Sequence, residues 1–187
     1  MNGPNSPADG AAPRSGVGTV RAWAHELVVG EDASLSPCGG GNGLVCAMER
    51  GARIFTGVYG GPVTCSVELL EDPARPPSGA EAQEWDDIVE ISVFSATGGL
   101  TLVAIEGEQP TGFPVLSFAG PGSYRLRVQV RGRDLDTDGV AEDASEYDDG
   151  VVPEPTEAYL LRMWPAAPAP DVIYQLRDAY GAWRRGT

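Results

Sequence analysis

Apolar and polar residues alternate strictly along residues 123–133. One set of alternating positions is apolar and the other is polar, namely Tyr124, Leu126, Val128 and Val130 against Arg125, Arg127, Gln129 and Arg131. A period of two is typical of a strand with one face in the core and the other in water. The preceding Gly120-Pro121-Gly122 predicts a sharp turn into this strand.

Further short apolar runs, separated by glycine and proline, predict more strands. They cover residues 20–29, 44–48, 53–59, 63–70, 88–94, 100–105, 114–118 and 158–164. Gly98-Gly99 predicts a tight hairpin between two of them. Such spacing, with almost no helical pattern before residue 170, indicates an all-β sandwich or barrel. We expect an antiparallel β-sandwich of about eight strands with a C-terminal α-helix.

The pattern divides the chain into a tail, one domain and a helix. Residues 1–18 hold three prolines and four glycines and are expected to be disordered, and residues 19–168 form the domain. Within residues 169–187, Asp171 can cap an amphipathic helix from Val172 to about Arg185. Its apolar stripe consists of Ile173, Leu176, Tyr180 and Trp183. We expect this stripe either to pack on the domain's own sheet or to dock on a partner or on a second copy of the chain.

The acidic residues of the chain are concentrated in one segment, residues 134–157. Among 187 residues there are 27 acidic residues and 13 basic ones, all arginine, so the net charge is −14. Residues 134–157 hold ten of the acidic residues and no arginine, which leaves 17 against 13, or −4, elsewhere. This balance argues against nucleic acid and anionic membranes as partners, because both are polyanions.

The acidic insert, residues 134–157, starts with half of a calcium-binding motif. Asp134, Asp136 and Asp138 precede Gly139 in the pattern D-x-D-x-D-G, and Glu142 falls at the ninth loop position. The twelfth position should be a bidentate glutamate, but it is Ser145, and Glu146 comes one residue late. The insert is therefore a calcium loop or an acidic, solvated hairpin. No other cofactor is expected.

A second interpretation of the insert is a binding role. A dense anionic segment attracts a basic protein and speeds their encounter, although it can also serve only to keep the surface soluble. We expect the contacts to come from Asp143, Glu146, Asp148 and Asp149, with Arg125, Arg127 and Arg131 on the neighbouring strand face.

The cysteines and the N-terminal residues indicate the compartment of the protein and its redox state. The first residues contain no basic start with an apolar run, and no stretch has the roughly 20 apolar residues of a membrane span. Cys46 and Cys65 lie among apolar neighbours and are expected to be buried thiols. A Cys38–Cys46 disulfide is possible by spacing but unexpected in a reducing compartment. We therefore expect a cytoplasmic protein.

Catalytic patterns are weak. The chain has no lysine and a single histidine, His25, which is expected on a strand beside Trp23. The glycine run at residues 39–43 precedes a strand rather than a helix, so it indicates a flexible loop. Asp86 and Asp87 are adjacent on a strand and should point to opposite faces. A hydrolase using carboxylates of residues 72–87 is the third hypothesis, after a non-enzymatic binding protein and a calcium-binding protein.

Three runs carry a resemblance to a known family. WDDIVEISVFSATGGLTLVAIEGE, FPVLSFAGPGSYRLRVQVRGRD and EAYLLRMWPAAP resemble an actinobacterial family of small uncharacterised β-sandwich proteins. The order of strands and turns is also similar, more distantly, to the competence protein J family, which includes an inhibitor of a DNA-entry nuclease. This resemblance covers roughly residues 44–168. It implies an inhibitor or immunity-type partner of a basic nuclease or toxin, with no catalytic residues.

Overall fold

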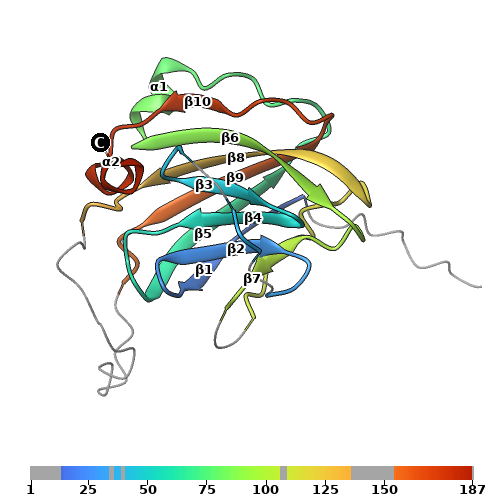
Figure 1. Cartoon of the computed structure of the whole chain (residues 1–187), viewed down its shortest axis with the longest axis horizontal. Helices are drawn as coiled ribbons and strands as arrows, with labels where there is room; N and C mark the ends of the chain where they lie inside the picture. The colour runs from blue at the N-terminus through green and yellow to red at the C-terminus, as the bar shows by residue number, and fades with distance from the viewer. Residues whose placement is uncertain (1–13, 34–35, 39–40, 106–108, 136–153, 187) are drawn as a thin grey trace, which may run out of the picture.

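The computed structural model describes residues 14–33, 36–38, 41–105, 109–135 and 154–186, and these residues are mostly in β-strands (Figure 1). A six-stranded sheet has the spatial order β1 (Ser15–Ala22), β5 (Gly61–Leu69), β9 (Ala158–Pro165), β8 (Gly122–Arg131), β6 (Asp87–Ser95) and β10 (Val172–Gln175). A four-stranded sheet has the order β3 (Val45–Met48), β4 (Gly51–Phe55), β2 (Glu26–Gly30) and β7 (Thr101–Val103). Two short helices, α1 (Gly79–Gln83) and α2 (Ala179–Arg185), complete the described part.

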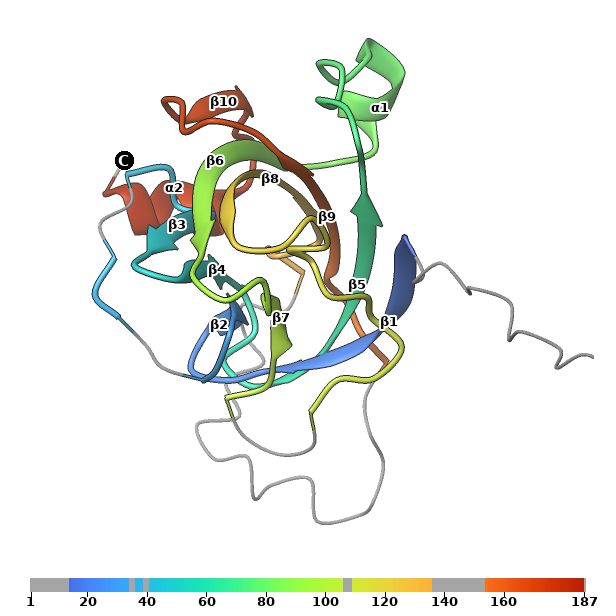
Figure 2. The same cartoon turned by 90° about the vertical axis from the view of Figure 1, so that its right-hand side faces the viewer.

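One hydrophobic core lies between the sheets. The apolar residues of the alternating run in β8 are at most 2% exposed, as expected. They pack in one cluster with Val63 and Val67 of β5 and with Leu27 and Ile54 of the smaller sheet. Figure 2 shows the two sheets facing each other across this interior. The sequence pattern therefore identified the inner face of β8 correctly.

The larger sheet is not purely antiparallel. β5 and β9 pair in parallel, with Thr64 opposite Ala158 and Leu69 opposite Met163. Parallel neighbours need a long connection rather than a hairpin. The chain between them builds β6, β7 and β8, which supplies that connection. The expected antiparallel arrangement holds for the other described strand pairs.

The first expected strand is divided by a hairpin turn. Ala24 and His25 have φ values of 51° and 63°, and Trp23 and Glu26 exchange backbone hydrogen bonds. Two central residues with positive φ are typical of the tight turn that links twisted strands. Beyond the single Trp23–Glu26 bridge the two strands separate, and β1 and β2 belong to different sheets. The expectation that His25 lies on a strand was wrong, because His25 occupies this turn.

The predicted disordered tail, residues 1–18, includes four residues that form part of a strand. Residues 15–18 belong to β1 and pair with β5. Their two glycines made the segment look disordered, but each serves packing. A Cβ on Gly16 would lie 2.5 Å from the Gly112 carbonyl oxygen, and a Cβ on Gly18 would touch the Phe113 ring at 3.3 Å.

The polar face of β8 is buried rather than exposed to water. Arg125 is 4%, Arg127 1% and Gln129 0% exposed, because α1 with its loop and the C-terminal segment cover this face. Arg127 donates to Glu90 at 2.9 Å, to the Arg75 carbonyl at 2.7 Å and to Tyr174. Of the four polar positions, Arg131 remains exposed and stacks on Trp85.

The C-terminal segment runs across this buried polar face. Arg125 donates to the carbonyl oxygens of Ala169 at 2.8 Å and Pro170 at 3.1 Å, and the Ser92 hydroxyl donates to Ala169 at 3.0 Å. β10 then adds to the sheet beside β6. Residues 169 and 170 therefore lie along the protein's own sheet.

The C-terminal helix is shorter than expected. Residues 172–175 form β10, and the N-cap of α2 is Asp178, which accepts from the Gly181 N–H at 2.7 Å, rather than Asp171. The helical spacing of the apolar residues gave a wrong prediction, because Ile173 belongs to strand β10, where it is 54% exposed. Tyr180 packs on Cys46 and Phe55, so α2 docks on its own domain.

Smaller differences concern two loops. Residues 114–118 form no strand; Leu116 donates one backbone hydrogen bond to the Leu100 carbonyl. Helix α1 lies between β5 and β6, where no helix was expected, and Ser78 caps it by accepting the Glu81 N–H. The outer polar loops therefore contain local structure that hydrophobic periodicity does not reveal.

The buried polar face leads to a stability prediction. Arg127→Ala leaves the buried Glu90 carboxylate with one fewer partner, so we expect the free energy of unfolding to fall by about 3–5 kcal/mol. Arg131→Ala, on the same face but exposed, should cost less than about 1 kcal/mol. Urea denaturation measures both. Equal losses for the two variants would show that the Arg127 side chain is not buried as described.

Candidate functional site

Four segments meet at one end of the molecule, which we call the α2 end (Figure 1). They are the turn at residues 23–25, the loop at residues 56–60, the two ends of the acidic insert, and α2. Backbone hydrogen bonds join the first two, from Thr56 to His25 and from His25 to Tyr59. Side chains of the insert's ends join the others, as described below.

Arg133 is the centre of the α2 end and is 0% exposed. Its Nε donates to Asp178 at 2.6 Å and one Nη to Asp87 at 2.8 Å. The other Nη donates to the carbonyl oxygens of Gly43 at 2.9 Å and Phe55 at 3.2 Å. One guanidinium therefore connects β6, α2, β4 and the loop before β3.

Asp87 illustrates the electrostatic balance of this cluster. Burial raises the pKa of its carboxyl, and the nearby Asp178 charge adds to the rise. The backbone N–H of Arg177 and the Arg133 charge act in the opposite direction. The sequence did not reveal Arg133, because it is the last residue of the run, after Arg131 and Gly132, where no apolar neighbour indicates burial.

Glu157 fixes the end of the insert. It is 1% exposed and accepts hydrogen bonds from the Val58 N–H at 2.5 Å, the Gly57 N–H at 3.1 Å and the Tyr159 hydroxyl. Burial raises the pKa of the Glu157 carboxyl, and these hydrogen bonds oppose the rise. The carboxylate thereby ties the insert to the loop between β4 and β5.

Asp134 fixes the start of the insert. Its two carboxylate oxygens accept the backbone N–H groups of Ala179 and Tyr180, each at 2.8 Å. These are unpaired donors in the first turn of α2, where a negative charge is favourable. Both oxygens of this expected calcium ligand are thus engaged by the helix.

The other expected insert residues cannot be placed. Asp136, Asp138 and Glu142 of the calcium motif and Asp143, Glu146, Asp148 and Asp149 of the binding hypothesis lie outside the described residues. Within the described ranges, no group of three histidine, cysteine, aspartate or glutamate residues is suited to a metal.

Aromatic rings form a row across the α2 end. In order they are Trp23, Tyr59, His25, Tyr180 and Trp183, with neighbouring ring centroids 5.2–6.1 Å apart. Trp183 is 71% exposed at one end of the row. Exposed tryptophan beside arginine is typical of protein-binding surfaces. Of the other tryptophans, Trp164 is 2% exposed, as expected for a residue of the interior or its rim.

The carboxylates of the hydrolase hypothesis are engaged by other groups. Asp86 lies just before β6 rather than on it and accepts the Gly132 N–H at 2.8 Å, whereas Asp87, the first residue of β6, binds Arg133. Glu81 lines a cavity of about 400 Å³ but is paired with Arg162. These contacts give Asp86, Asp87 and Glu81 structural partners.

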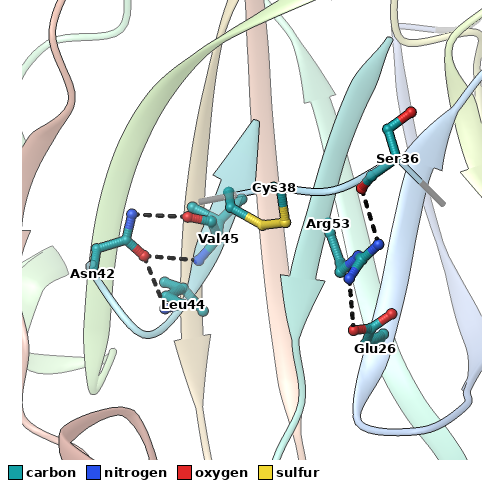
Figure 3. The surroundings of a disulfide bond; sticks show 8 residues. Glu26, Ser36, Cys38, Asn42, Leu44, Val45 and Arg53 are labelled. Atoms are coloured by element: carbon teal, nitrogen blue, oxygen red, sulfur yellow. Dashed lines mark hydrogen bonds and ion pairs between the residues drawn. A yellow bond between two sulfur atoms is a disulfide. The ribbon is translucent and has the colours of Figure 1, made fainter. Parts of the chain in front are cut away.

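Cys38 and Cys46 form a disulfide, with their Cα atoms 5.8 Å apart (Figure 3). The expectation that Cys46 is a free thiol was therefore wrong: the loop before β3 turns back and brings Cys38 over that strand. Cys65 is a free, buried thiol as expected, and burial raises its pKa to about 12. Because disulfides persist mainly in oxidising compartments, cysteine usage no longer supports a cytoplasmic location.

Comparisons with known proteins add little. No family model matches the chain, and no curated protein does. One solved structure, "Crocagin biosynthetic gene J", is similar over 82% of this chain and 97% of that chain, with 15% identity and a TM-score of 0.43. This similarity is too low to inform function. In the described residues, no helix is long and apolar enough to cross a membrane.

The role of Asp134 can be measured. Asp134→Ala leaves two N–H groups of α2 without an acceptor, so we expect the free energy of unfolding to fall by about 1 kcal/mol. Glu154→Ala is the control, because Glu154 is an exposed acidic residue of the same insert. If both variants unfold at the same urea concentration, Asp134 does not cap α2.

Proposed function

We propose that this protein is a non-catalytic binding module whose acidic insert attracts a basic protein, as an inhibitor or immunity-type partner does. The observation that carries the proposal is the placement of the insert. Ten of the 27 acidic residues lie in it, and both of its ends are fixed at the α2 end by Asp134 and Glu157. The other eight acidic residues of the insert lie between these two anchors in the sequence.

The arginines support the proposal because many of them are already engaged. Ion pairs within the described part involve seven of the 13, namely Arg14, Arg53, Arg125, Arg127, Arg133, Arg162 and Arg185. Their carboxylate partners belong to the body rather than to the insert. These seven guanidinium groups are thus paired with carboxylates of the body, and the proposal is that the insert's charge acts on a partner.

The aromatic row supplies a second kind of contact at the same end. Coulomb attraction mainly accelerates encounter, whereas affinity comes from desolvated aromatic and apolar contacts. Trp183 is exposed and stacks on Tyr180 with ring centroids 5.7 Å apart, which holds its ring in place. We infer that the insert steers the partner and that Trp183 anchors it.

Several earlier expectations remain part of this proposal. An antiparallel sandwich architecture, apart from the parallel pair, is our interpretation of the two facing sheets. A cytoplasmic location and the resemblance to the actinobacterial family are retained as hypotheses. Calcium binding stays a hypothesis, because Asp136, Asp138 and Glu142 lie outside the described residues and Asp134 binds α2.

The test compares two variants of equal net charge. Asp143→Asn, Glu146→Gln, Asp148→Asn and Asp149→Asn are combined in the first, and Glu49→Gln, Asp72→Asn, Glu84→Gln and Asp171→Asn, all exposed, in the second. Proteins retained from an extract of the source cells by the wild-type chain are purified, and their affinity for each variant is measured by calorimetry. We expect a basic partner, about tenfold weaker binding to the insert variant, and little change for the control.

Two results would refute the proposal. One is that the wild-type chain retains no basic protein. The other is that the purified partner binds both variants with equal affinity. The difference in partner affinity between the wild-type chain and the insert variant should also become smaller as salt is added, because salt screens exposed charges.

A further inference from the structure

The Cys38–Cys46 disulfide joins a peripheral loop to the smaller sheet. Cys46 lies on β3 and is 2% exposed, whereas Cys38 lies in the loop before that strand and is half-buried. Near Cys38, the Ser36 carbonyl accepts a hydrogen bond from Arg53 at 3.1 Å (Figure 3). In addition to the backbone, the disulfide links the described residues 36–38 covalently to β3.

The disulfide also covers part of the surface on which α2 rests. Cys46, Phe55 and Tyr180 form a small buried cluster, and Cys38 packs against it. Arg184 lies over the Phe55 ring at 3.8 Å from its centroid. Movement of Cys38 away from β3 would therefore expose apolar surface directly beside α2.

The next part of the loop is held independently of the disulfide. The Asn42 side chain accepts from the N–H groups of Leu44 and Val45 and donates to the Val45 carbonyl, at 2.8–2.9 Å (Figure 3). Arg133 and Arg185 bind the carbonyl oxygens of Gly43 and Asn42. Breaking the disulfide would thus free the segment around Cys38, by which we mean residues 36–38, while residues 42–45 stay in place.

We propose that the Cys38–Cys46 disulfide is a redox-operated clasp, whose reduction releases the segment around Cys38 and uncovers the Cys46–Phe55–Tyr180 cluster at the α2 end. The reductant is a dithiol. One of its thiolates attacks the accessible Cys38 sulfur and displaces the Cys46 thiolate; its second thiolate then releases Cys38. The two cysteines gain two electrons and two protons, and the reductant becomes a disulfide.

The clasp goes beyond the proposed binding role and does not depend on it. If the disulfide only stabilised the fold, its reduction would loosen the whole structure. The independent support of residues 42–45, together with the extensive core, instead confines the change to the segment around Cys38 and α2. The uncovered cluster is adjacent to Trp183, because Tyr180 contacts both.

The experiment follows alkylation and amide exchange in the full chain, before and after reduction with dithiothreitol. In the oxidised protein we expect no cysteine to react with iodoacetamide. After reduction, Cys46 should react within about tenfold of the rate of Cys38, and the amides of residues 180–185 should exchange at least about tenfold faster. Cys65 is the internal control, since it is fully buried and should stay unlabelled in both states.

Two outcomes would overturn the clasp. If Cys38 reacts and Cys46 stays protected, with exchange in α2 unchanged, the loop remains closed without the bond. If Cys65 becomes labelled and exchange rises throughout the core, the disulfide is a general staple of the fold. The variant Cys38→Ala/Cys46→Ala checks the cause: its exchange should match that of the reduced protein and should not respond to dithiothreitol. A response to dithiothreitol in that variant would equally contradict the proposal.

Discussion

Buried guanidinium groups on and just after β8 determine how the C-terminal part of this protein folds. A charged side chain that leaves water must be paired and hydrogen-bonded, or its burial is prohibitively unfavourable. Each buried arginine meets this requirement with a different later segment. Arg125 binds the carbonyl oxygens of residues 169 and 170, Arg127 binds Tyr174, and Arg133 binds Asp178. The C-terminal segment is thereby laid along β8, in order, until it reaches α2.

The same constraint builds the α2 end. Arg133 connects Asp87 and Asp178 with the carbonyl oxygens of Gly43 and Phe55, so the loop before β3 and α2 share one charged centre. Asp134 and Glu157 then fix the two ends of the acidic insert to this centre's surroundings. A charged segment with fixed ends costs less conformational entropy on binding than a free tail. The Cys38–Cys46 disulfide packs in the same small cluster as Tyr180 of α2.

Hydrophobic alternation predicted the inner face of β8 and the existence of most strands, because core burial leaves a direct mark on every second residue. It could not predict that Arg125 and Arg127 are buried, since alternation separates two faces without revealing what covers the polar one. The helical spacing of Ile173, Tyr180 and Trp183 likewise reflects a strand, a turn and a short helix that share no single stripe. Arg133 and the disulfide depend on contacts between distant segments. Asp134 was identified as a charged candidate, but its partner, the first turn of α2, follows only from the fold.

Hydrogen exchange in the variant Arg133→Lys tests most directly whether Arg133 holds the α2 end together. Lysine keeps the positive charge but lacks the planar fork that reaches two carboxylates and two carbonyl oxygens at once. We expect the amides of residues 179–185 to exchange at least about tenfold faster than in the wild type, while those of β5 and β8 keep their protection. Unchanged exchange in α2 would contradict the central role assigned to Arg133.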